Sequence, residues 1–74
     1  MERGDLQRVV GENLRAYRRE RNINQEDLAD RLGLHRTYLS DIERGARNLS
    51  LQKVEAFAEL LGLEPLALLT PGKT

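Results

Sequence analysis

The ten residues from His35 to Arg44 contain the side chains of this sequence that are best suited to molecular recognition. Leu39 and Ile42 have the spacing of inward positions on a helix. The outward positions of that helix are then Arg36, Thr37, Ser40, Asp41 and Arg44. A guanidinium can contact guanine through two hydrogen bonds, and a threonine methyl can contact thymine. This face therefore suits a helix that enters the major groove of DNA by its first turns.

Other kinds of site find little support. His35 is the single histidine and the chain has no cysteine, which excludes a multi-histidine or thiolate metal site. We find no Ser/His/Asp arrangement, no nucleotide-binding loop and no paired carboxylates with an identifiable cleft. The sequence predicts a protein that is not an enzyme and that uses no metal and no cofactor.

The pattern around this segment predicts an all-α fold. Apolar residues recur at intervals of three and four, and alternating strand patterns are nearly absent. We expect five helices, at about residues 5–22, 25–32, 35–44, 51–61 and 65–69. Asn24 and Ser50 are suited to cap the second and fourth helices, and Gly33 and Gly62 to end them. Gly11, inside the first helix, indicates close approach of another backbone.

The length of the chain and the distribution of its charges limit the number of domains and the kind of partner. Seventy-four residues fit one small domain, which we place at residues 5–69 with flexible tails at 1–4 and 70–74. Twelve basic side chains balance twelve acidic ones, but residues 1–22 and 34–53 are net positive and the other segments net negative. Such local charge can steer a polyanion despite overall neutrality. No segment reads as a signal peptide or a membrane helix, so we expect a cytoplasmic protein.

The two short helices that meet at Gly33 predict a helix-turn-helix. The segment NQEDLADRLGLHRTYLSDIERGARNLSLQKVEAF, from Asn24 to Phe57, resembles the DNA-binding domain of XRE-type, phage-repressor-like regulators. Within it, HRTYLSDIERGARNLSL is most similar to the controller proteins of restriction–modification systems. The resemblance implies a five-helix phage-repressor-like fold with its helix-turn-helix at the second and third helices.

The resemblance also assigns roles to single residues. It implies base contacts from Arg36, Thr37, Tyr38 and Ser40. It implies backbone contacts from Gln25, Arg47 and Asn48, to which we add His35 and Arg44. It further implies a structural ion pair between Arg18 and Glu43. For Tyr38, packing against the core remains an equal alternative, and Asp41 is unusual because a carboxylate near phosphates is repulsive.

Six of the ten residues from Leu60 to Leu69 are leucine, more than a domain of this size can bury. We therefore predict a homodimer through Leu63, Leu66, Leu68 and Leu69, unless the last helix only covers its own core. A two-fold dimer would bind an inverted-repeat operator in double-stranded DNA.

The predicted function is that of a dimeric transcriptional regulator, the controller of a restriction–modification system. An antitoxin or a prophage-type repressor of the same fold is the alternative. From another class, a protein-interaction module that docks a partner such as RNA polymerase also remains open.

Overall fold

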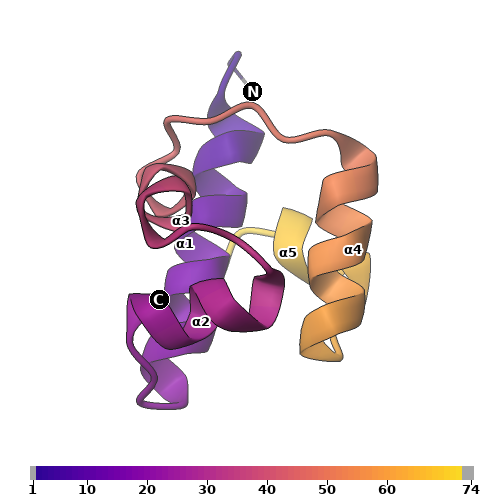
Figure 1. Ribbon diagram of the computed structural model, residues 1–74. Coiled ribbons are helices and arrows are strands. Elements are labelled where there is room, and N and C mark those ends of the chain that lie inside the picture. Colours follow the sequence, from indigo (N-terminus) through magenta and orange to yellow (C-terminus); the bar gives the residue numbers. More distant parts are fainter. Residues whose placement is uncertain (1, 73–74) are drawn as a thin grey trace.

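The computed structural model describes residues 2–72 and contains five helices and no strand within that range. The helices are α1 (Asp5–Glu20), α2 (Gln25–Leu32), α3 (Arg36–Glu43), α4 (Leu51–Leu61) and α5 (Pro65–Leu69). Figure 1 shows α2 and α3 side by side in front of α1, with α4 on the other side of α5. The predicted all-α, five-helix class is confirmed. Of the predicted tails, Met1, Lys73 and Thr74 lie outside the described residues.

The helix ends follow the local chemistry of the sequence. The side chain of Asn24 accepts a hydrogen bond from the backbone N–H of Asp27 at 2.8 Å, and that of Ser50 accepts one from Lys53 at 3.0 Å. Gly33 and Gly62 end α2 and α4 in the left-handed region, both at φ 70°. These four predicted caps are confirmed, because each satisfies backbone groups that a helix end leaves free.

The core lies between the five helices, each of which contributes buried side chains. Its largest fully buried side chains are Leu14, Leu28, Leu39, Ile42 and Leu68. α1 packs against α3 and α5, while α4 packs against α2 and α5. The close approach predicted at Gly11 is confirmed: a Cβ there would overlap the carbonyl oxygen of Ile42 and lie 2.9 Å from that of Glu43. Gly11 therefore allows α1 to touch the end of α3 directly.

The short helix α5 is fixed to α1 by one side chain. The amide nitrogen of Asn13 donates to the carbonyl oxygens of Leu68 at 2.9 Å, Thr70 at 2.8 Å and Ala67 at 3.2 Å. Asn13 thus satisfies carbonyls that the end of α5 leaves without helical partners.

One predicted interface residue belongs to the core instead. Leu68 is only 1% exposed and packs inside its own chain, so its assignment to the dimer interface was wrong. The helix period explains the correction, because α5 turns Leu68 inward when it turns Leu66, which is 72% exposed, outward.

Candidate nucleic-acid interface

The outer face of α3 is polar and accessible. Arg36, Thr37 and Arg44 are exposed, and Ser40 and Asp41 are half-buried. On the opposite face, Leu39 and Ile42 are 0% and 1% exposed. The two buried side chains fix the rotation of α3 about its axis, so that its polar side chains face solvent. The structure thus brings three of the predicted base-contacting residues, Arg36, Thr37 and Ser40, together on one face of α3.

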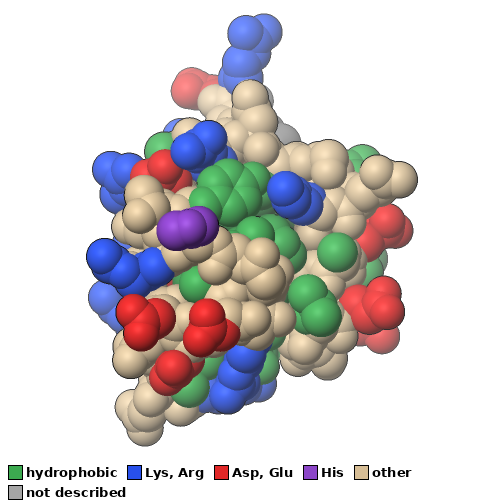
Figure 2. Space-filling model, viewed as in Figure 1, with side chains coloured by type: hydrophobic (Ala, Val, Ile, Leu, Met, Phe, Trp, Pro, Cys, Tyr) green, Lys and Arg blue, Asp and Glu red, His purple; other side chains and the backbone are tan. Residues whose placement is uncertain are grey.

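The charge around α3 is divided. In Figure 2 the single histidine, His35, lies in the middle of the viewed face, with Lys and Arg side chains above it and to its left. Carboxylates lie below it, over α2. His35 is the N-cap residue of α3, and its side chain makes no capping hydrogen bond. The neutral total charge therefore conceals a cationic region beside α3 and an acidic region on α2.

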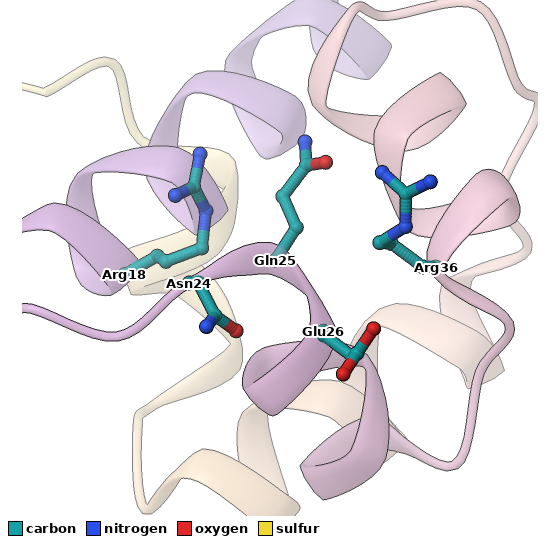
Figure 3. Close-up of a pocket in the computed structure, with 5 residues that line it drawn as sticks. All are labelled: Arg18, Asn24, Gln25, Glu26 and Arg36. Atoms are coloured by element: carbon teal, nitrogen blue, oxygen red, sulfur yellow. The ribbon is translucent and has the colours of Figure 1, made fainter.

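The N-terminal ends of α2 and α3 border an open hollow of about 560 Å³. Its lining residues are Arg18, Asn24, Gln25, Glu26 and Arg36. In Figure 3 the amide of Gln25 and the guanidinium of Arg36 extend toward the same side of the hollow. The first backbone N–H groups of a helix have no helical partner and favour anions. This arrangement can hold a phosphate next to the side chain that would read a base.

Arg18, Gln25 and Glu43 form what we call the buried junction. The Nε and Nη2 atoms of Arg18 each donate to a carboxylate oxygen of Glu43 at 2.9 Å. The side-chain amide of Gln25 donates to the same carboxylate at 3.1 Å. The side chain of Glu43 is 0% exposed. The junction joins α1, α2 and the end of α3 through one carboxylate.

The charged state of Glu43 is favoured by its partners. Burial by itself would raise the pKa of Glu43, but hydrogen bonds from Arg18 and Gln25 and the charges of Arg18 and Arg15 lower it overall. The Nε atom of Arg15 lies 3.7 Å from the carboxylate. The contact between Gln25 and Glu43 was missed by sequence reasoning, because the two residues are separated by 18 positions. Gln25 is therefore half-buried: it binds the carboxylate of Glu43 and also lines the hollow.

A second cluster, Asp41 with Arg44 and Arg47, lies at the surface, and we call it the surface triad. One carboxylate oxygen of Asp41 accepts a hydrogen bond from Arg44, and the other accepts one from Nε of Arg47 at 3.3 Å. The hydrogen bond from Arg44, more than the one from Arg47, lowers the pKa of Asp41. Asp41 thus pairs with two residues that were predicted to contact the DNA backbone.

Tyr38 contacts the core on one side and two basic side chains near the surface triad on the other. It is half-buried and packs against the core, and its ring lies under two cations, Arg47 at 5.0 Å and Lys53 at 5.3 Å. Such contacts stabilise a cation by roughly 0.5–1 kcal/mol at exposed sites. Tyr38 therefore positions the cations next to α3. The contact of Lys53 with the Tyr38 ring was missed by sequence reasoning. It forms because α4, which carries Lys53, begins close to α3.

The linker between α3 and α4 is held by α1. The side-chain amide of Gln7 donates to the backbone oxygen of Arg47 at 2.6 Å. Gly45, at φ 75°, packs so closely on Arg8 that a Cβ would lie 2.7 Å from the Cγ of that arginine. Arg47 and the exposed Asn48 thus project from a fixed linker beside α3.

The remaining predicted interface leucines do not form one patch. Leu69 lines a small apolar hollow of about 80 Å³ with Leu6 and Leu51, which are 42% and 71% exposed. Leu63 lines a different hollow, beside Tyr17. The exposed apolar surface near the end of α5 therefore includes residues from α1 and α4 that were not predicted.

No group of three or more His, Cys, Asp or Glu side chains in residues 2–72 is placed to hold a metal ion. Within the same part of the chain, every helix is too short or too polar to cross a bilayer.

Comparison with known proteins agrees with this geometry. The family model HTH_3, described as "Helix-turn-helix", matches residues 14–68. The chain is 44% identical to control protein C.BamHI of Bacillus amyloliquefaciens over 66 residues, which cover 88% of this chain and 82% of that protein. It is 41% identical to control protein C.SmaI of Serratia marcescens, covering 89% and 79%.

A solved complex shows the same fold on DNA. The restriction–modification controller protein C.Esp1396I, crystallised as a tetramer with its natural 35-base-pair operator, is similar with a TM-score of 0.73 and 34% identity. The similarity covers 86% of this chain and 84% of that one. These relatives are control proteins, not enzymes.

Proposed function

Because this chain belongs to the helix-turn-helix (HTH_3) family, we propose that it is the controller protein of a restriction–modification system. It is a DNA-binding transcriptional regulator, and its proposed operator is an inverted repeat that a homodimer binds. The observation that carries the proposal is the outer face of α3, where exposed Arg36 and Thr37 stand beside the hollow at the start of α2. We place this activity in the cytoplasm, together with the DNA.

On this proposal Arg36, Thr37, Tyr38 and Ser40 contact bases or lie next to them. Among these, Arg36 is the strongest candidate, because its guanidinium takes part in no ion pair found within residues 2–72. Tyr38 has a second role beneath Arg47 and Lys53. The half-buried Ser40 can reach only a base edge that comes close to α3.

The proposed backbone contacts surround this face. Gln25 lies at the hollow on one side of α3, and Arg47 and Asn48 lie in the linker on the other. His35 and Arg44 are exposed at the two ends of the helix. Such contacts fix the register of a protein on a duplex, whereas base contacts select the sequence.

Dimerisation is proposed through the apolar surface around the end of α5. Leu66 and Leu69 remain candidates there, and we add Leu6 and Leu51, which border the same small hollow as Leu69. Leu63 lies apart, beside Tyr17, and is a peripheral candidate. Burying each exposed leucine contributes about 1.5–3 kcal/mol before the entropy of association is subtracted.

Binding to the DNA upstream of the protein's own gene tests the proposal. We expect a footprint over an inverted repeat with half-sites about 34 Å apart, and affinity that falls steeply with salt. Arg36→Ala should weaken operator binding about 10- to 100-fold, since a bidentate base contact contributes about 1–3 kcal/mol. Arg31→Ala, which removes an exposed arginine at the other end of α2, is the matched control. If the Arg36→Ala and Arg31→Ala variants bound the operator with equal affinity, the assignment of α3 as the helix that reads the bases would be wrong.

The dimer has its own test. Leu66→Asp should shift the sedimentation mass toward the monomer, because it places a charge in the proposed interface. Leu60→Asp is the control, since Leu60 is 59% exposed on α4 and outside that interface. A monomer produced by the Leu60 variant and not by the Leu66 variant would move the interface to the C-terminal end of α4, away from Leu51.

We also propose RNA polymerase as a partner of the DNA-bound dimer. Asp27 and Asp30 are exposed on α2 and do not line the hollow, and phosphates would repel them. They are therefore available to a basic surface of another protein bound alongside. Transcription in vitro with Asp27→Asn/Asp30→Asn tests this: activation should fall while the footprint is unchanged, and unaltered activation would exclude this contact.

A further inference from the structure

We propose that Asp41 is a specificity-determining residue, whose carboxylate occupies Arg44 and Arg47 in the free protein and so weakens binding to DNA of the wrong sequence. The inference rests on the proposed DNA-binding function. It concerns a residue that is absent from the base and backbone contacts proposed above.

The first argument is the geometry of the surface triad. Asp41 accepts hydrogen bonds from Arg44 through one oxygen and from Nε of Arg47, at 3.3 Å, through the other. The Nη2 atom of Arg47 also lies 3.3 Å from that second oxygen. A phosphate would use these same donors, because carboxylates and phosphates both accept from the guanidinium fork. Asp41 therefore takes the place that a DNA phosphate would take.

The second argument is that the pairs can exchange. The side chains of Arg44 and Arg47 are 63% and 50% exposed, so another oxyanion can reach them. Exposed ion pairs of this kind are individually weak. Tyr38 and Gln7 keep Arg47 beside α3 whether or not Asp41 is its partner. Replacing the carboxylate by a phosphate therefore requires little rearrangement of the chain.

The third argument is the position of Asp41 on the helix. It follows Thr37 by one turn on the outer face of α3. When Arg36 and Thr37 dock α3 in the groove, Asp41 faces base edges, where the amino group of a cytosine can donate to it. On a non-operator duplex the protein has only phosphates to contact, and the carboxylate then competes with them for Arg44 and Arg47. Its unfavourable effect is therefore larger on the wrong DNA.

Fluorescence anisotropy with the operator and with a scrambled duplex of equal length tests the inference. Asp41→Asn should tighten binding to the scrambled duplex about fivefold, in keeping with the small stabilisation of exposed ion pairs, and change operator affinity less than about twofold. The affinity ratio between the two duplexes should fall accordingly. The salt dependence on the scrambled duplex should become steeper, because Arg44 and Arg47 are freed to displace counterions.

Two controls separate this effect from charge alone. Glu59→Gln removes the same unit of charge from an exposed position on α4 and should leave the ratio unchanged. In the background Arg44→Ala/Arg47→Ala, the additional change Asp41→Asn should no longer tighten scrambled binding. Equal tightening on both duplexes, or weaker binding to both, would overturn the inference. A wild-type protein that does not prefer the operator would overturn the proposed function instead.

Discussion

Two carboxylates of α3, only two residues apart, have opposite surroundings. Glu43, at the centre of the buried junction, has a side chain that is 0% exposed, whereas Asp41, at the centre of the surface triad, has one that is 20% exposed. Both bind arginine, and in both the pKa is lowered. The difference lies in the solvent. The carboxylate of Glu43 is shielded from water in the folded protein, whereas that of Asp41 is reached by solvent and can exchange a partner for water or a phosphate.

This difference assigns the two clusters to different tasks. Breaking a buried pair leaves one charge without compensation, which is strongly unfavourable. An exposed pair is screened and exchanges readily. The buried junction therefore joins α1, α2 and α3, and the surface triad adjusts how the outer face of α3 meets a polyanion. Chemically similar ion pairs serve fold and function according to their burial.

The largest effect should come from Glu43→Ala. It leaves the guanidinium of Arg18 and the amide of Gln25 without their shared acceptor, and we expect a loss of about 3–5 kcal/mol in the free energy of unfolding. Urea denaturation measures this loss. Asp41→Ala is the matched change in the surface triad, and an equal loss there would contradict the comparison.

Gly11→Ala should have the next largest effect. The added Cβ meets the backbone carbonyls of Ile42 and Glu43, so α1 must move away from α3 and strain the buried junction. Overpacking of this kind costs about 1–3 kcal/mol, occasionally more. Thermal unfolding followed by circular dichroism checks this prediction. A variant as stable as wild type would mean that α1 can shift without disturbing the junction.

Acid should lower the free energy of unfolding by less than Glu43→Ala or Gly11→Ala does. Protonation removes the charge of Glu43, but the protonated carboxyl group still accepts hydrogen bonds. The pKa of Glu43 lies below its ordinary value of 4.5 in the folded protein. Its stabilising contribution is therefore complete above pH 4.5 and is lost as the pH falls through the lowered pKa. Urea titrations from pH 6 downward should show this decline. Glu43→Gln should decline less, and an identical decline would assign the effect to other carboxylates.

The smallest change in stability should come from Asp41→Asn. Its carboxylate is partly exposed and its arginine partners are largely exposed, so the urea midpoint should stay close to that of the wild type. The same variant is expected to change discrimination between DNA sequences. A large loss of stability would show that the surface triad also supports the fold.

Local chemistry made much of the fold predictable. Asn24, Gly33, Ser50 and Gly62 act within one turn of their own helix, so the sequence alone placed them. Leu39 and Ile42 likewise determined which face of α3 is outward. The assignment of Leu68 to an interface was wrong because the rotation of a five-residue helix depends on what it packs against.

Less of the candidate site could be predicted from the sequence. The outward positions of α3 follow from the helix period, but their partners do not. Gln25 reaches Glu43 and Arg47 reaches Asp41 only after the chain has turned at a linker. Whether Asp41 repels DNA or pairs with arginine was undecided until Arg47 could be placed. The roles of Arg36, Thr37 and the backbone-contacting residues stay predictions.

The hydrogen bonds of Asn13 to the end of α5 affect how the protein is made. A helix of five residues is not stable alone, and its terminal carbonyls are held by a side chain 54 to 57 positions earlier. A nascent chain can complete this contact only after Thr70 has left the ribosome. The apolar surface at the end of α5 therefore forms only after the other four helices have been synthesised.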